Sequence, residues 1–111
     1  MKIKVLASGS KGNCSLIETK STRFLIDIGI TYQKLKKELE KMNLNVDDID
    51  ALFLTHAHND HTSGLKVLLK HSNFKIYVNK DIIKELTIDI DPERIEMYDN
   101  LMHIKNNTEI S

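Results

Sequence analysis

A continuous apolar run that leads directly into a cluster of histidines is the feature that most constrains how this chain can fold. The run is Ala51-Leu52-Phe53-Leu54, which is typical of a β-strand buried on both faces. Residues two apart along an extended chain point the same way, so we predict that His56 and His58 project together from the end of this strand. The chain then turns, and the adjacent Asp60 and His61 diverge to opposite sides.

The histidine cluster has the composition of a site for two neighbouring metal ions. His56 and His58 are directed toward one ion, and Asp60 and His61 toward the other. Imidazole nitrogen and carboxylate oxygen are ligands that zinc, manganese and iron accept. Two ions roughly 3.5–4 Å apart can share a bridging hydroxide, which is a nucleophile at neutral pH. The alternative is a polar loop of solvated histidines, but shuffling would give H-x-H-x-D-H on the order of once in a thousand chains.

The rest of the chain alternates strand-like and helical segments, which predicts an α/β layered fold. Thr31 can cap a helix in which Tyr32, Leu35 and Leu39 recur at helical spacing. Residues 8–13 form a turn cluster with two glycines. Strands are expected at residues 3–7, 15–18, 24–28, 51–54 and 75–78, helices at 32–42, 65–69 and 79–86, and a final hairpin at 95–98 and 101–104.

Composition limits the function classes. The chain has 111 residues, about the size of one domain, and with no Trp, three Phe and three Tyr its core is expected to be aliphatic. A net charge of zero argues against binding nucleic acid by bulk positive charge, although not against a local groove. The single cysteine, Cys14, excludes an internal disulfide and is expected to be a small buried apolar residue. No apolar run nears the roughly 18 residues of a membrane span, and we expect a cytoplasmic protein without membrane contact.

Three motifs together resemble one family of enzymes. The histidine cluster resembles the signature of the metallo-β-lactamase-fold hydrolases in Thr55-His56-Ala57-His58-Asn59-Asp60-His61. That family has a strand ending in an aspartate beside the metal site, to which Phe24-Leu25-Ile26-Asp27-Ile28-Gly29 is similar. The S-G-S-x-G-N opening of a bacterial and phage subgroup resembles Ser8-Gly9-Ser10-Lys11-Gly12-Asn13. This subgroup includes single-stranded-DNA 5′ exonucleases and phage relatives that cleave cyclic nucleotides.

The resemblance implies a role for each matching residue. His56 and His58 would bind the first ion and Asp60 and His61 the second, with zinc the expected metal and manganese or iron the alternatives. Asp60 would also be the catalytic carboxylate. Asp27 would lie behind the ligands and orient one of them by hydrogen bonding, although it could instead cap the helix that follows.

The turn at residues 8–13 has two interpretations. Its main-chain N–H groups could cradle a phosphate, with Ser8, Ser10 and Asn13 as candidate substrate contacts. The alternative is a tight turn in which Gly9 and Gly12 supply positive φ angles.

The function implied is a metal-dependent hydrolase of phosphodiester bonds. A metal-bound hydroxide would attack the phosphorus of single-stranded DNA or a cyclic nucleotide, while the ions offset charge on its oxygens. Hydrolysis of a thioester or lactam on the same fold is an alternative. A further alternative is a catalytically incomplete half-domain, because a zinc ion needs four ligands or three plus water.

The resemblance covers only the first half of the family's αββα sandwich. The family completes its site with a further His, a bridging Asp and a last His, whereas this chain offers only His71 and His103 after the cluster, neither in a matching context. Residues 1–111 are therefore expected to form one N-terminal portion, a mixed sheet with helices on one face, without the C-terminal half. The explanations are a fragment or truncated product, a partner chain that supplies the second half, or a homodimer.

Overall fold

A six-stranded mixed sheet organises the chain, and the computed structural model describes residues 1–10 and 12–98. The strands lie side by side in the order of the sequence. The first two pairings are antiparallel and the last three are parallel. The strands are β1 (Lys2–Ala7), β2 (Cys14–Glu18), β3 (Arg23–Ile26), β4 (Ala51–Phe53), β5 (Lys75–Val78) and β6 (Ile95–Met97).

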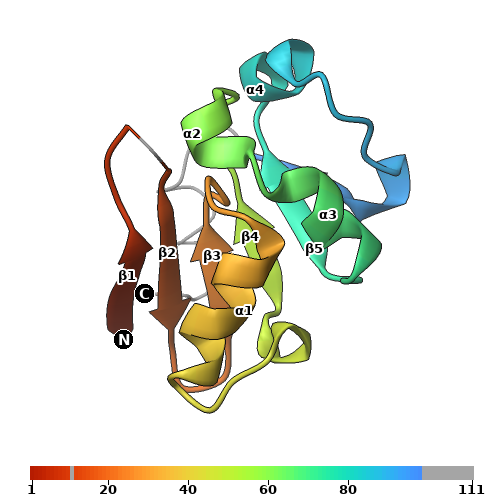
Figure 1. Ribbon diagram of the computed structural model, residues 1–111. Helices are drawn as coiled ribbons and strands as arrows, with labels where there is room; N and C mark the ends of the chain where they lie inside the picture. The colour runs from red at the N-terminus through yellow and green to blue at the C-terminus, as the bar shows by residue number, and fades with distance from the viewer. Residues whose placement is uncertain (11, 99–111) are drawn as a thin grey trace.

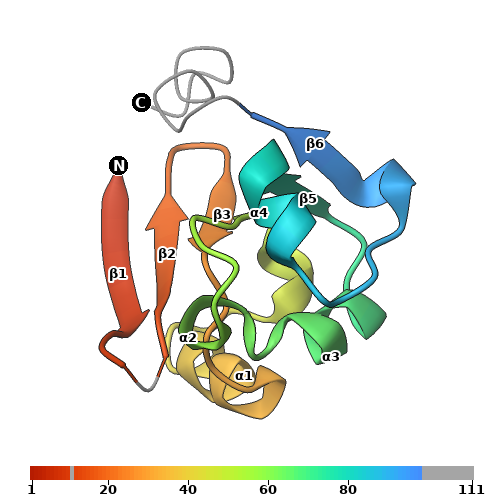
Figure 2. The same cartoon turned by 90° about the horizontal axis from the view of Figure 1, so that it is seen from above.

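Helices fill the connections between the parallel strands. Figure 1 shows α1 and α3 lying over the same face of the sheet, with α2 and α4 at its upper edge. Figure 2 shows the strands from above. This arrangement confirms the predicted α/β fold class, a mixed sheet with helices. The helices are α1 (Tyr32–Glu40), α2 (Asn59–Thr62), α3 (Leu65–Lys70) and α4 (Lys80–Glu85), with 3₁₀ turns η1 (Val46–Asp48) and η2 (Pro92–Arg94). Within the described residues, no helix is long and apolar enough to cross a bilayer.

The elements follow the sequence prediction, with four main differences. Strand β3 ends at Ile26 instead of residue 28, because Asp27 takes a left-handed φ of 63°. Helix α1 is capped by the Thr31 side chain as predicted, but it ends at Glu40, and Asn43 then takes a left-handed φ of 59°. The turn predicted between His58 and His61 is part of a short helix, α2, that the sequence did not predict. Strand β6 pairs in parallel with β5, and the second strand of the expected hairpin, residues 101–104, lies outside the described residues.

The main core lies between the sheet and the helices. Strand β4 is buried along its whole length, as predicted for a central strand. Its Leu52 faces the helix side, whereas Ala51 and Phe53 belong to a second cluster on the other side. The helix-side cluster is aliphatic, and its fully buried members include Leu16, Leu25, Leu35, Leu39, Leu52, Leu65, Leu68, Ile76 and Val78.

The expectation of an aliphatic core is wrong for the second cluster. Phe53 stacks on Tyr77 with ring centroids 4.5 Å apart, and Phe24 lies 4.9 Å from Phe53. The hydroxyl of Tyr98 donates a hydrogen bond to the carbonyl of Leu54. The aromatic residues are few, but alternation along neighbouring strands places them on one face, where they pack together.

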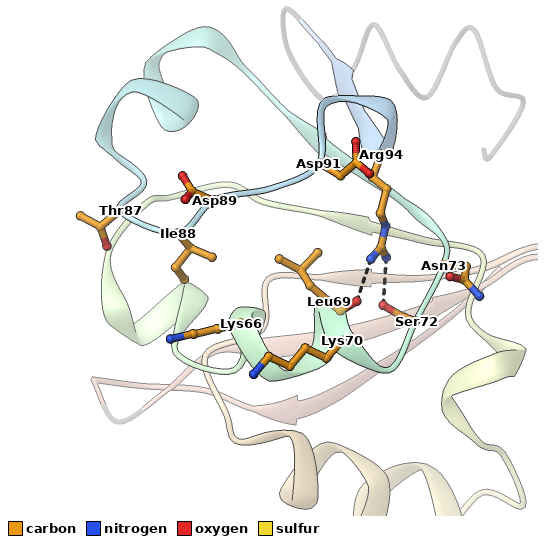
Figure 3. Close-up of a pocket in the computed structure, with 10 residues that line it drawn as sticks. All are labelled: Lys66, Leu69, Lys70, Ser72, Asn73, Thr87, Ile88, Asp89, Asp91 and Arg94. Atoms are coloured by element: carbon orange, nitrogen blue, oxygen red, sulfur yellow. Dashed lines mark hydrogen bonds between the residues drawn. The ribbon is translucent and has the colours of Figure 1, made fainter.

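A hollow of about 790 Å³ lies beside α3, and Figure 3 shows the residues that line it. Arg94 at this hollow donates to main-chain carbonyls, through Nη1 to Leu69 at 2.9 Å and through Nε to Phe74 at 3.0 Å. Its Nη2 donates to the Ser72 hydroxyl at 2.9 Å. Arg94 therefore ties η2 to α3 and to the loop that precedes β5, instead of facing the hollow as a free cation.

The buried thiol of Cys14 gives a prediction about reactivity and pH. Burial, with a smaller effect from the Asp27 carboxylate, raises the pKa of Cys14 to about 12. We therefore expect no reaction with Ellman's reagent at pH 8 until the chain unfolds, because only the thiolate is nucleophilic.

The same pKa shift sets a stability change. The thiol has a pKa near 9 in the unfolded chain and about 12 in the folded chain. Its contribution to the free energy of unfolding is therefore fully present below pH 9 and is lost as the pH rises toward 12. Denaturation of the wild type and of Cys14→Ala across this range measures the difference. Equal pH dependence of the two chains, or rapid labelling of the folded wild type, would contradict the buried placement.

Candidate metal centre

Two neighbouring parallel strands bring the parts of the site to one edge of the sheet. In the parallel register Ile26 pairs with Phe53, so β3 and β4 end at the same level. The residue after β3 is Asp27, whose N–H donates to the Phe53 carbonyl at 2.8 Å. The first residue of the histidine cluster, His56, follows the end of β4 by three residues. The carboxyl ends of the parallel strands therefore place Asp27 beside the cluster, as the sequence predicted.

Asp27 is buried, with 4% of its surface exposed, and its carboxylate accepts three hydrogen bonds. Its Oδ1 accepts the N–H of Thr55 at 2.8 Å. Its Oδ2 accepts the hydroxyl of Thr55 and the Nδ1 of His61, the latter at 2.7 Å. Thr31 provides the cap of α1, so the alternative that Asp27 caps this helix is wrong.

These hydrogen bonds fix the tautomers of two histidines. An ionised carboxylate can only accept, so Nδ1 of His61 carries its proton toward Asp27. The Thr55 hydroxyl gives its single proton to Asp27 and must accept the Nδ1 proton of His56, which lies 2.9 Å away. Both imidazoles therefore keep Nε2 as the free nitrogen that can bind a metal ion.

Thr55 is the functional residue that sequence reasoning missed. The resemblance predicted that Asp27 orients one ligand. In the structure the Thr55 hydroxyl bonds to both Asp27 and His56, so Asp27 also orients a second ligand, through Thr55. Its position in the sequence could have pointed to Thr55, because this residue lies between the buried strand and the first histidine.

Asp27 also has an unusual backbone conformation. Its φ of 63° lies in the left-handed region, which is uncommon for a residue with a side chain. The following N–H, of Ile28, donates to the His61 carbonyl at 2.8 Å, and the N–H of Gly29 donates to the Asn13 carbonyl at 2.8 Å. Three segments far apart in the sequence thus hold this turn in place, as expected where strain is kept at a functional site.

The structure brings together some of the predicted ligands more closely than others. Donor atoms of Asp27, His56 and His61 lie within 4.8 Å of one another, close enough to hold a metal ion. The ring centroids of His56 and His61 are 4.3 Å apart, whereas those of His56 and His58 are 6.4 Å apart. Oδ2 of Asp60 lies 3.5 Å from Nε2 of His61. His58 is exposed, and its pairing with His56 on one metal ion stays a prediction.

The donor set of this site suits a first-row metal ion. It consists of imidazole nitrogens and carboxylate oxygens, the groups such ions accept in proteins. His61 and Asp60 remain partly exposed, with 18% and 34% of their side chains accessible, so solvent reaches these ligands.

The other candidate residues lie in different surroundings. Ser8 and Ser10 are exposed in the turn between β1 and β2, which the N–H of Gly12 closes by donating to the Gly9 carbonyl. Asn13 in the same turn contacts Asp60. His71 stacks on Tyr32 with ring centroids 4.6 Å apart. His103 lies outside the described residues.

Comparison with known proteins places this geometry in a family. Residues 7–99 match the model of the metallo-beta-lactamase superfamily. The exodeoxyribonuclease WalJ of Streptococcus pneumoniae is 37% identical over 79 residues, which cover 71% of this chain and 29% of that protein. The anti-Pycsar protein Apyc1 of Paenibacillus harenae is 35% identical over 89 residues, covering 75% of this chain and 35% of its own length.

Solved structures share the fold. The metallo-beta-lactamase SMB-1 bound to 2-mercaptoethanesulfonate aligns with a TM-score of 0.68 at 15% identity, covering 86% of this chain and 43% of that one. The chain thus spans about a third of the length of the curated relatives described above, and less than half of this solved structure.

The close packing of Gly29 against the histidine cluster gives a prediction. A Cβ at this position would lie 1.9 Å from the Asp60 carbonyl oxygen and 2.5 Å from the Asn13 nitrogen, both of them main-chain atoms. We expect Gly29→Ala to lower the free energy of unfolding by about 2–3 kcal/mol, and to weaken metal binding because Asp60 must move.

A matched glycine separates this crowding from backbone strain. Gly9 has a φ of +109°, but an added Cβ would meet nothing within 4 Å. We expect Gly9→Ala to cost only about 1 kcal/mol, as measured by denaturation. A Gly29→Ala chain as stable as the wild type would show that these segments do not pack as described.

Proposed function

This chain is a member of the metallo-beta-lactamase superfamily, and we propose that it is the metal-binding portion of a hydrolase that cleaves phosphodiester bonds. One observation carries the proposal: the rings of His56 and His61 lie close together with their Nδ1 atoms hydrogen-bonded to Thr55 and Asp27, and Nε2 of His61 lies beside the carboxylate of Asp60. Imidazole nitrogens held in place by hydrogen bonds, close to a solvent-accessible carboxylate, are typical of a metal site.

The proposed ligands follow the motif. His56 and His58 bind one ion, and Asp60 and His61 bind a second, with zinc the first choice and manganese or iron the alternatives. Asp27 orients ligands instead of binding metal, because both of its oxygens already accept hydrogen bonds from Thr55 or His61.

The residues of the chain orient the proposed metal ligands and leave them accessible to solvent. The hydrogen bonds of Asp27 prevent the His61 ring from turning and stabilise positive charge that it gains on binding a cation. Asp60 is the proposed catalytic carboxylate, since its partly exposed side chain stands beside Nε2 of His61. A bound divalent ion would lower the pKa of water and offset negative charge on the oxygens of a phosphate.

The substrate is proposed from the relatives. WalJ and YycJ of Bacillus anthracis are exodeoxyribonucleases, which supports DNA as the substrate, and the subgroup resemblance of residues 8–13 supports its single-stranded form. The subgroup resemblance of residues 8–13 supports a cyclic nucleotide as the alternative. The net charge of zero favours local recognition of a phosphate at the metal edge over a long basic track.

The metal centre needs donors beyond those in the described residues. Two ligands for each ion fall short of the four, or three plus water, that zinc takes. Outside the cluster, His71 is the one further histidine in residues 1–10 and 12–98, and it stacks on Tyr32. We therefore propose that donors outside the described residues complete the site, supplied by the remainder of a longer protein, by a second chain or by a second copy. The relatives are about three times as long as this chain.

Metal titration of histidine variants tests the ligand assignment. We expect His58→Ala to weaken zinc binding more than about tenfold, because it removes a ligand. His71→Ala is the matched control and should leave zinc affinity unchanged. Competition with a chromophoric chelator measures both variants, and an unaltered affinity of His58→Ala would remove His58 from the site.

Hydrolysis assays test the reaction class. The zinc- or manganese-loaded chain is incubated with 5′-labelled single-stranded DNA and with cyclic nucleotides. The proposal expects product from one of them when the missing donors are present, as in a homodimer of this chain, with loss of product on adding a chelator and in His56→Ala. Metal binding without hydrolysis of either substrate would contradict a complete enzyme, and would favour the half-domain that needs a second chain.

A further inference from the structure

We propose that Asn13 is a positioning residue of the metal centre, whose carboxamide holds the carboxylate of Asp60 beside His61. This inference rests on the proposed function, because it takes Asp60 to be a metal ligand. In this proposal Asn13, in the turn between β1 and β2, positions a metal ligand, in place of the substrate contact that the sequence suggested.

The hydrogen bonds of Asn13 reach directly to Asp60, 47 positions away in the sequence. The side-chain Nδ2 donates to the Asp60 carbonyl at 3.2 Å and lies 3.4 Å from its Oδ2. The main-chain N–H of Asn13 donates to the same carbonyl at 2.6 Å. Both the backbone and the carboxylate of Asp60 are therefore held from one residue.

The orientation of the amide is determined by Gly9. The N–H of Gly9 donates to Oδ1 of Asn13 at 3.2 Å, and the Gly9 carbonyl accepts from Nδ2 at 3.1 Å. Reversing the amide would direct Oδ1 at the carbonyl and carboxylate oxygens of Asp60, which cannot donate. The turn thus forces the amino group toward Asp60, and a side chain with a donor and an acceptor on one short planar group is required.

The placement of Asp60 matters because its side chain is otherwise held only loosely. It is 34% exposed, and its Oδ2 lies 3.5 Å from Nε2 of His61. One N–H of the Asn13 amide donates to Gly9, and the other is shared between the carbonyl and Oδ2 of Asp60, which keeps this oxygen near His61 before a metal ion arrives. Holding a ligand in advance reduces the conformational entropy lost on binding, so the predicted effect of Asn13 is on metal affinity.

The backbone around Asn13 is built for this approach. Gly12 has a φ of +148°, and a Cβ there would lie 2.3 Å from the Gly29 carbonyl oxygen. The Gly29 N–H donates to the Asn13 carbonyl at 2.8 Å. Glycines at these two contacts allow the turn to lie against the strand end, so the side chain of Asn13 reaches the metal loop.

A double-mutant cycle with zinc as the probe tests this proposal. Zinc affinity is measured by chelator competition for the wild type, Asn13→Ala, Asp60→Ala and the double variant. We expect Asn13→Ala to weaken binding about tenfold and to have no further effect once Asp60 is removed, because it acts through that carboxylate. Asn13→Asp is a second variant, which keeps the shape and the acceptor for Gly9 but removes the donor, and should also weaken binding.

Asn45 provides the matched control for a purely structural asparagine. Its side chain accepts the N–H of Asp47 at 2.9 Å and caps η1, before the start of β4 and thus at the opposite edge of the sheet. We expect Asn45→Ala to lower the unfolding free energy but to leave zinc affinity unchanged. Zinc affinity and denaturation together therefore separate positioning from general stability.

The outcomes distinguish failure of this inference from failure of the proposed function. If Asp60→Ala does not weaken zinc binding, Asp60 is not a ligand and both ideas fall. If Asp60→Ala weakens binding while Asn13→Ala and Asn13→Asp do not, only the role of Asn13 is overturned. An equal loss from Asn13→Ala in both backgrounds also overturns it, since the effect would bypass Asp60.

Discussion

The buried carboxylate of Asp27 is the interaction on which the rest of the structure depends. It ends β3 in a left-handed conformation and accepts hydrogen bonds from Thr55 and His61 of the neighbouring segment. A buried carboxylate without donors would cost several kcal/mol, so the segment after β4 must close over it. The hydrogen bonds that compensate for burying the Asp27 carboxylate also orient the imidazoles. Both the fold and the candidate site therefore depend on these bonds.

Local sequence patterns predicted most of the fold. The apolar run at residues 51–54 marked the central strand, and Thr31 marked the start of α1. The sequence could not show that Phe53 and Tyr77 stack on the reverse face, or that β6 runs parallel to β5. Both features depend on which strands become neighbours, and that is decided by packing between distant segments.

The candidate site was predictable in its residues but not in its geometry. The spacing H-x-H-x-D-H and the aspartate of the preceding motif identified His56, His61 and Asp27, which the structure brings together. The sequence could not show that α2 brings the ring of His61 close to that of His56. It also could not show that Thr55 hydrogen-bonds to His56 and Asn13 to Asp60. The contacts of Asn13 and Asp27 with the loop cross long stretches of sequence, so no spacing rule reveals them.

The tautomers of the histidines test the central role of Asp27 most directly. Long-range ¹H–¹⁵N correlation spectra of the metal-free chain at pH 8, where an ordinary imidazole is neutral, distinguish protonation at Nδ1 from protonation at Nε2. The account predicts the Nδ1–H form for His56 and His61, with the exposed His58 as an internal reference. The Nε2–H form at His61 would contradict it, because Asp27 could not then be the acceptor that fixes the ring.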